Sequence, residues 1–340
     1  MAENPIEVLI TLQFNESQLE TLKEVSPRFN FTLRPGKRTE EISAEDWAKA
    51  EILYTDRTLP SLAQAPRLRW IQFHYAGIDF VSDIPIVRKP GLVATTLSGA
   101  AAPQIAEYAL MMMLALGHRL PDLFANQQKA EWPRDRWERF SPLELRQSTV
   151  GLVGYGSINR EIARLVQPLG PTILAAKQDA MNPHDTGYTP RGLGDTEGDL
   201  FHRLYPIQAI KSMLKECDFV IVALPLYPGT RGLINAEVFS ALKPTAFFID
   251  FSRGGITDHA ALVGAIQDKR LAGAALDVFP EEPLPPASPL WRLPNVIITP
   301  HIGGVSPHYM ARAAEMFSEN LSRYVANQPL FNQFDLEKGY

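Results

Sequence analysis

Residues 149–159 read Thr-Val-Gly-Leu-Val-Gly-Tyr-Gly-Ser-Ile-Asn. The apolar run 149–153 predicts a buried strand, and the residues after the glycines predict an amphipathic helix. Its apolar face is formed by Ile158, Ile162, Leu165, Val166 and Leu169. Gly154 and Gly156 therefore lie between a strand and a helix, which is the context in which a pair of glycines indicates a phosphate-binding turn. The first glycine permits a tight turn, the second lets a pyrophosphate approach the backbone, and the helix N-terminus supplies amides and a positive dipole. We expect a dinucleotide-phosphate site here.

Two positions depart from the usual pattern of such a turn. Asn159 stands where a third glycine allows close helix–strand packing, and we expect it to push the helix slightly outward. Lys177 lies 23 residues after Gly154, about where an acid binds the ribose 2′-hydroxyl of NAD. A lysine cannot accept that hydrogen bond but can pair with a 2′-phosphate, which favours NADP over NAD. Two alternatives stay open: Asp179 could supply the acid, or Lys177 could be a solvated surface residue.

Strand-like and helix-like segments alternate on both sides of this turn. Before it, runs at 6–12, 51–54, 68–73 and 92–96 predict strands, with helical spacing at 16–25 and 43–49. After it, further apolar runs at 172–175, 219–224, 246–250, 272–276 and 296–299 are typical of parallel strands covered on both faces. The alternation predicts two parallel α/β sheets. Residues 178–206 are rich in Gly, Asp, Thr and Pro, which predicts an insertion loop.

Two long helices and an arm complete the chain. The segment 103–120 predicts a helix that is apolar on nearly every side, and such a helix needs cover all round. Residues 126–147, rich in Trp, Pro and Arg, predict an irregular arm, and 307–327 predicts a closing helix. We expect a homodimer that uses the first helix and the arm.

Composition excludes several classes of function. The 340 residues carry 33 Lys and Arg against 38 Asp and Glu, a net charge of −5 that offers nucleic acid no general attraction. The one cysteine, Cys217, cannot form an internal disulfide, which fits a reducing compartment. The N-terminus lacks signal-peptide character, and the longest apolar run, 108–116, is about half a membrane span. We expect a cytoplasmic protein without membrane segments or a metal site.

Three polar residues lie at or just beyond strand ends in the second half of the chain. Arg253 follows Phe247-Phe-Ile-Asp-Phe-Ser252, Glu282 precedes Pro283, and His301 lies in Thr299-Pro-His-Ile-Gly303. Open α/β sheets hold their ligands at the carboxyl ends of parallel strands, so we expect these side chains to share a site.

The order and spacing of these motifs resemble the D-isomer-specific 2-hydroxyacid dehydrogenase family, which includes phosphoglycerate dehydrogenase and glyoxylate/hydroxypyruvate reductase. The resemblance covers nearly the whole chain and rests on Gly151-Leu-Val-Gly-Tyr-Gly-Ser-Ile158, Ser252-Arg-Gly-Gly255, Gly273-Ala-Ala-Leu-Asp-Val-Phe279, Glu282-Pro-Leu284 and Pro300-His-Ile-Gly-Gly304. It implies a Rossmann cofactor domain, residues 103–303, inserted into a smaller flavodoxin-like substrate domain, residues 1–102 and 304–340.

The resemblance also implies roles for single residues. His301 would be the general acid or base, Glu282 its carboxylate partner that favours the imidazolium form, and Arg253 the anchor of the substrate carboxylate. Ala76 and Gly77 would grip that carboxylate through backbone amides. Other positions match cofactor-binding ones: Asp277 at the nicotinamide carboxamide, with Ser157, Ile158, Phe251, Ser252 and Gly304 lining the cofactor.

The leading interpretation is an NAD(P)-dependent reductase of glyoxylate, hydroxypyruvate or a related 2-keto acid. A corepressor-like binding protein on the same fold remains the alternative, because such proteins also retain a catalytic-like triad. Formate dehydrogenase pairs its histidine with glutamine, so Glu282 disfavours that activity. Phosphite dehydrogenases place a lysine where Ala76 stands, which disfavours that one as well.

Overall fold

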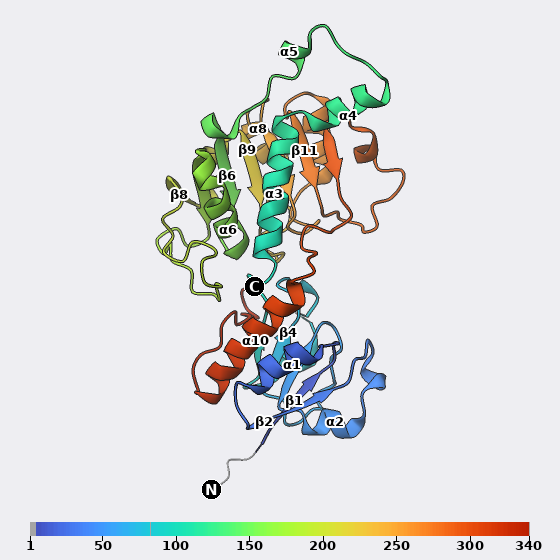
Figure 1. Ribbon diagram of the computed structural model, residues 1–340, viewed down its shortest axis with the longest axis vertical. Helices are drawn as coiled ribbons and strands as arrows, with labels where there is room; N and C mark the ends of the chain where they lie inside the picture. The colour runs from blue at the N-terminus through green and yellow to red at the C-terminus, as the bar shows by residue number, and fades with distance from the viewer. Residues whose placement is uncertain (1–4, 82, 340) are drawn as a thin grey trace. The chain divides into compact units, whose positions relative to one another are not determined.

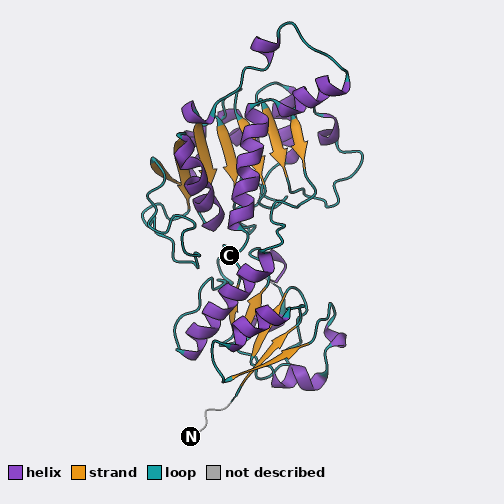
Figure 2. Ribbon diagram, viewed as in Figure 1, coloured by secondary structure: helices purple, strands orange, loops and turns teal. Residues whose placement is uncertain are grey.

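The computed structural model describes residues 5–81 and 83–339, which form two compact units (Figure 1). The smaller unit contains the chain up to Ala101 together with the segment from Ser306 onward. The larger unit is Ala102–Val305. Each unit is built around one parallel sheet with helices packed on it (Figure 2).

The larger unit contains seven parallel strands in the order β12-β11-β10-β9-β6-β7-β8. Their bounds are β6 Thr149–Val153, β7 Thr172–Lys177, β8 Arg203–Pro206, β9 Phe219–Val222, β10 Phe247–Asp250, β11 Gly273–Leu276 and β12 Val296–Ile298. From β6 the strand order runs outward in both directions, so β6 and β9 flank the switch point of a Rossmann sheet. Since all these strands are parallel, every loop that follows one of them starts at the same edge.

Helices cover both faces of this sheet. α3 (Ala102–Gly117) packs against α6 (Ser157–Val166) on one face (Figure 1), while α8 (Ala236–Ala241) packs against α7 (Ile210–Leu214) and α9 (His259–Gln267) on the other. The core joins strand residues such as Val220 and Phe248 to Phe239 of α8. The inner strands β9, β10 and β11 are buried on both sides, which explains why their sequences are apolar without alternation.

The predicted helix 103–120 is interrupted in the structure. α3 ends at Gly117, and α4 (Leu120–Gln128) begins after Arg119, whose φ of 54° is left-handed. Pro121 stands in the first turn of α4, where its missing N–H costs nothing. The predicted irregular arm, 126–147, contains the end of α4 and the short helix α5 (Arg136–Arg139).

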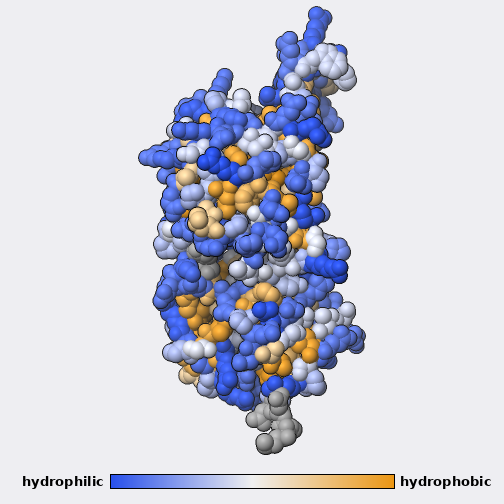
Figure 3. Space-filling model, turned by 90° about the vertical axis from the view of Figure 1, so that its left-hand side faces the viewer, coloured by the Kyte–Doolittle hydropathy of each residue, from blue (hydrophilic) through white to orange (hydrophobic). Residues whose placement is uncertain are grey.

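Several large apolar side chains of these helices and the arm lie exposed. They are Met111, Leu114, Leu123, Phe124, Trp132 and Trp137. Figure 3, a view from another side, also shows hydrophobic residues at the surface of the larger unit. Among residues 5–81 and 83–339, no helix has the length and apolar character needed to span a membrane.

The smaller unit contains five parallel strands in the order β2-β1-β3-β4-β5, which is the flavodoxin order. They are β1 Ile6–Ile10, β2 Phe29–Leu33, β3 Ile52–Thr55, β4 Trp70–Phe73 and β5 Val93–Thr95. α1 (Glu16–Lys23) packs beside the closing helix α10 (Tyr309–Val325), whose Phe317 contacts Tyr54 and Trp70. Trp47 of α2 (Ala44–Lys49) is fully buried in the apolar cluster of this unit.

Two strands were not predicted. β2 has only five residues, and its sequence, Phe-Asn-Phe-Thr-Leu, is not a continuous apolar run. β8 lies inside the segment 178–206 that was predicted to be a loop, and it pairs in register with β7 from Leu174 opposite Arg203 to Lys177 opposite Pro206. That prediction was wrong for residues 203–206. Edge strands need less apolar sequence than central ones, because one side of their ladder has no neighbouring strand.

Candidate active site

The glycine turn has the backbone geometry that a dinucleotide site requires. Gly154 has a φ of 91°, and a Cβ there would lie 2.4 Å from the carbonyl oxygen of Ala223. Gly156 is the N-cap of α6, and a Cβ built on it would meet no atom within 4 Å. Gly154 is thus required by close packing, whereas Gly156 borders open space at the helix N-terminus. Ser157 and Ile158, half-buried, form the first turn of α6.

Asn159, which is expected from the sequence to push the helix slightly outward, makes side-chain hydrogen bonds that link the helix to the strand end. Its side chain is fully buried, and Nδ2 donates hydrogen bonds to the carbonyls of Val153 (3.1 Å) and Gly154 (2.9 Å). The amide thereby satisfies two carbonyls at the strand end. Both hydrogens of the amide nitrogen therefore have acceptors, whereas the buried Oδ1 has no hydrogen-bond partner among the described residues.

Lys177 lies at the carboxyl end of β7, half-buried. Its Nζ donates to the backbone carbonyls of Asn182 (2.7 Å) and His184 (3.2 Å). Burial, with the nearby charge of Arg160, lowers the pKa of Lys177 below its ordinary value. Asp179, the alternative acid, accepts hydrogen bonds from the Met181 amide and the Asn182 side chain, so its carboxylate is engaged in its own turn.

The turn that carries Arg253 is held by a buried carboxylate that sequence reasoning missed. Asp250, at the end of β10, is fully buried and accepts from the Ser252 amide (2.9 Å), the Ser252 hydroxyl (2.5 Å) and Thr257 Oγ1 (2.5 Å). Burial raises the pKa of Asp250. Arg253 donates to the Ser252 carbonyl at 2.8 Å, and Phe251 is buried with its ring near that of Tyr108. The signal in the sequence that could have revealed this role of Asp250 is an acidic residue at the end of an apolar strand.

His301 and Glu282 are in direct contact. His301 Nδ1 lies 2.8 Å from Glu282 Oε2, and the other oxygen of Glu282 accepts the Phe279 amide at 2.9 Å. With a carboxylate beside Nδ1, that nitrogen carries a proton and Nε2 is left to face a ligand. Glu282, rather than the adjacent Glu281, therefore orients the imidazole. Both side chains are partly exposed.

Asp277 holds the turn on which His301 stands. Its buried carboxylate accepts from Thr299 Oγ1 (2.6 Å), the Ile302 amide (2.9 Å) and the Gly303 amide (2.8 Å). His301 itself has a left-handed φ of 54°, which nothing in the sequence pattern indicated. These contacts engage both oxygens of Asp277, which we had expected to meet a nicotinamide carboxamide. On the far side of the turn, the Gly304 carbonyl accepts from Gln104 at 2.6 Å.

In the smaller unit, Ala76 and Gly77 lie in the loop that follows β4. Ala76 is exposed and Gly77 half-buried. The loop starts from His74, which is buried, with Nδ1 2.7 Å from the Tyr54 hydroxyl and its carbonyl accepting from the Tyr309 hydroxyl at 2.6 Å. Burial lowers the pKa of His74 to about 4, so this histidine is neutral near pH 7.

Comparison with known proteins identifies the family. Residues 110–303 match the model of the D-isomer specific 2-hydroxyacid dehydrogenase NAD binding domain. A glyoxylate reductase of Korarchaeum cryptofilum is 31% identical over 76% of this chain and 73% of its own length. The chain belongs to the D-isomer specific 2-hydroxyacid dehydrogenase family. The predicted family and fold class are thereby confirmed.

Other relatives show how far the likeness within this family extends. A D-3-phosphoglycerate dehydrogenase of Methanocaldococcus jannaschii is 27% identical over 95% of this chain and 58% of that protein. The chain spans about half the length of two phosphoglycerate dehydrogenases among the proteins that it matches. A 2-hydroxyacid dehydrogenase of Xanthobacter autotrophicus Py2, solved in complex with NADPH and MES, has a TM-score of 0.80 and 25% identity, covering 99% of this chain and 100% of that one.

The larger unit of this family member has the features that a nicotinamide dinucleotide needs. Gly156 leaves open space at the N-terminus of α6, where amides and the helix dipole suit a pyrophosphate. The loops after β10, β11 and β12 start at the same edge of the sheet and carry Arg253, Glu282 and His301. Within the described ranges, no three His, Cys, Asp or Glu side chains cluster closely enough to bind a metal ion.

Proposed function

We propose that this protein transfers a hydride between a nicotinamide cofactor and a small 2-keto or D-2-hydroxy acid. The observation that carries the proposal is the contact between His301 and Glu282 at 2.8 Å, on the sheet edge that also bears the glycine turn. Similarity to a glyoxylate reductase and to phosphoglycerate dehydrogenases supports the substrate class. The test is a panel of 2-keto acids, including glyoxylate and hydroxypyruvate, with both NADH and NADPH. No turnover with any of them would contradict the proposal.

The chain's own residues divide the work of this reaction. The cofactor supplies or accepts the hydride when bound. His301 donates a proton from Nε2 to the substrate's carbonyl oxygen during reduction and removes it during oxidation. Glu282 holds the imidazole by Nδ1 and stabilises its protonated form. Arg253 binds the substrate carboxylate through its planar guanidinium. The backbone amides of Ala76 and Gly77 are the substrate-binding groups that we assign to the smaller unit.

Replacement of His301 by alanine tests the central role. We expect turnover to fall by roughly 10²–10⁴-fold, the usual contribution of a general acid, with little change in cofactor affinity. Steady-state kinetics measures the first quantity, and quenching of protein fluorescence by NAD(P)H measures the second. Unchanged turnover would remove His301 from the mechanism.

Within this function we propose that NADP(H) is preferred. The support is Lys177 at the end of β7, together with the NADPH complex of the Xanthobacter relative. A lysine near a 2′-phosphate gains about 1 kcal/mol at surface-like screening, or roughly a fivefold preference. The measurement is kcat/KM for NADPH against NADH in the wild type and in Lys177→Asp. A wild-type ratio below one that the substitution leaves unchanged would overturn this preference.

We also propose the division of labour between domains and the assembly. Residues 103–303 form the dinucleotide-binding domain, which also carries Arg253 and His301, and residues 1–102 with 304–340 form the substrate domain. The exposed apolar side chains of α3 and the arm, Met111 and Trp137 among them, support a homodimer through these segments. A monomer in light scattering at micromolar concentration would contradict it.

The buried thiol of Cys217 supports a reducing, cytoplasmic location, and the net charge of −5 supports the absence of nucleic-acid partners.

A further inference from the structure

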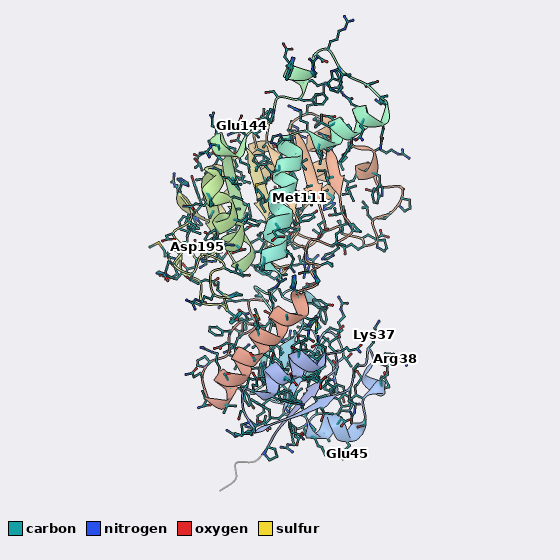
Figure 4. The ribbon with its side chains drawn as sticks, in the orientation of Figure 1. Lys37, Arg38, Glu45, Met111, Glu144 and Asp195 are labelled. Carbon is teal, nitrogen blue, oxygen red and sulfur yellow. The ribbon has the colours of Figure 1, made fainter. Side chains whose placement is uncertain are left out.

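The insertion between β7 and β8, residues 178–202, has no part in the function described so far. It starts directly after Lys177, at the carboxyl edge of the sheet and beside α6 (Figure 1). Figure 4 labels Asp195, which lies in this loop. The insertion contains no helix or strand, yet two sets of contacts with the glycine turn and α6 hold it in place.

The first anchor is Asp195. Asp195 is 5% exposed, and its carboxylate accepts hydrogen bonds from the backbone amides of Gly198 (3.0 Å), Asp199 (3.1 Å) and Leu200 (3.2 Å). The same carboxylate accepts the hydroxyl of Tyr155 at 2.5 Å. Tyr155 stands between Gly154 and Gly156 and is 1% exposed. The far part of the insertion is therefore tied to the phosphate-binding turn itself.

The second anchor is Arg160 on α6. Its guanidinium lies 4.7 Å from the centre of the Tyr155 ring and donates to the carbonyls of Asp195 and Pro183. Its Nε is 3.6 Å from the carboxylate of Asp185. Arg160 is 1% exposed, and a buried guanidinium is costly unless its donors are satisfied. Nη1 and Nη2 have carbonyl acceptors in the insertion, whereas Nε has no hydrogen-bond partner among the described residues and makes only the ion pair with Asp185. The two carbonyl contacts favour packing of the insertion against α6.

Arg160 and Lys177 bind neighbouring backbone carbonyls of the insertion. Arg160 holds the carbonyl of Pro183, and the carbonyls on either side of it, from Asn182 and His184, accept from Lys177 Nζ. Three successive carbonyls thus connect the two cations. Two of the three ammonium hydrogens of Lys177 are used in this way, which leaves one to point at a ligand.

We propose that the insertion is a specificity-determining element that orients the ammonium of Lys177 toward the 2′-phosphate of an adenosine ligand, with Arg160 as its positioning residue. The inference rests on the proposed role of Lys177 in NADP(H) preference and adds the cause of its orientation. A lysine on a free surface samples many rotamers, and fixing one of them before the ligand binds removes that entropic cost.

The experiment compares two nucleotides that differ only by the 2′-phosphate: 2′,5′-ADP and 5′-AMP. Calorimetry on the intact chain gives the affinity ratio for the wild type, Lys177→Met, Arg160→Met and the double variant. Lys211→Met, which removes an exposed lysine paired with Glu237, is the matched control. We expect the wild type to favour 2′,5′-ADP by about fivefold, and Lys177→Met to abolish that preference.

Arg160→Met should lose most of the preference while 5′-AMP binds as before, and the double variant should fall no further than Lys177→Met. If Lys177→Met lowers the ratio and Arg160→Met does not, the insertion does not orient Lys177. The proposal about the insertion is then wrong, while the proposed preference for NADP(H) is supported. If Lys177→Met leaves the ratio unchanged, both proposals fail.

A second variant covers the case in which Arg160→Met does not fold. Tyr155→Phe removes the hydroxyl bound by Asp195 and keeps the ring beneath Arg160. It should lower the ratio in the same direction and speed tryptic cleavage after Arg191, which is exposed in the insertion. Wild-type values for both the ratio and the cleavage rate would overturn the proposal.

Discussion

Replacement of Asp277 by asparagine separates a structural role from a cofactor contact. The substitution keeps the shape of the side chain and exchanges one acceptor oxygen for an NH₂ donor. In the structure, one oxygen of Asp277 accepts from Thr299 and Ile302, and the other accepts from the Gly303 amide. Asparagine can serve only one of these two groups of donors, so at least one N–H loses its acceptor.

The expected cost follows from burial and charge. Asp277 is 2% exposed. A hydrogen bond to a charged group contributes about 1.5–3 kcal/mol, so loss of the Gly303 bond should reduce the free energy of unfolding by the same amount. The left-handed backbone of His301, with φ of 54°, costs about 1–2 kcal/mol, and these amide contacts hold it. A shift of about 1 Å in His301 should lower kcat by roughly 10²-fold.

Urea unfolding and steady-state kinetics on Asp277→Asn measure both quantities. Asp268→Asn is the control, because the exposed side chain of Asp268 makes an ion pair with the exposed Arg270. Wild-type stability and wild-type kcat in Asp277→Asn would refute the assignment of Asp277 to the His301 turn. A raised KM for NAD(P)H with unchanged stability would instead support the carboxamide contact implied by the family resemblance.

Three further predictions follow from the same geometry. Glu282→Gln should lower kcat by about 10-fold or more, because the amide stabilises imidazolium less well, whereas Glu281→Gln should leave kcat unchanged; equal effects in a side-by-side assay would contradict the pairing. Gly154→Ala should abolish cofactor binding or folding, since a Cβ would lie 2.4 Å from a carbonyl oxygen, and an alanine variant that binds NAD(P)H normally in a fluorescence titration would contradict this. The folded pKa of His74, about 4, lies below its unfolded value of 6.5, so the stability that the neutral ring contributes is complete above pH 6.5 and declines toward pH 4. In His74→Gln the loss of stability over that range should be smaller, by up to about 3 kcal/mol in urea titrations; an identical pH profile would show that His74 is not the group responsible.

Features that depend on short stretches of chain could be predicted from the sequence. The turn at Gly154 and Gly156 is recognisable because strand, turn and helix are contiguous and each has its own periodicity. The apolar runs of β9, β10 and β11 could be located because strands covered on both faces need apolar side chains at every position. Arg253 and His301 followed from the rule that ligands bind at the carboxyl ends of such strands.

The hydrogen-bond and ion-pair partners that lie far apart along the chain could be found only in the folded structure. Asp277 reaches residues 22 to 26 positions away, and Arg160 reaches the insertion 23 to 35 positions away. Such partners are chosen by packing between segments, and a buried charge reveals its partner only once the segments are folded together. β8 could not be predicted for the same reason, because its few residues form a strand only by pairing with β7. Local periodicity determines where elements form, whereas the requirement to satisfy every buried polar group, which no local pattern encodes, determines how the loops between them are held.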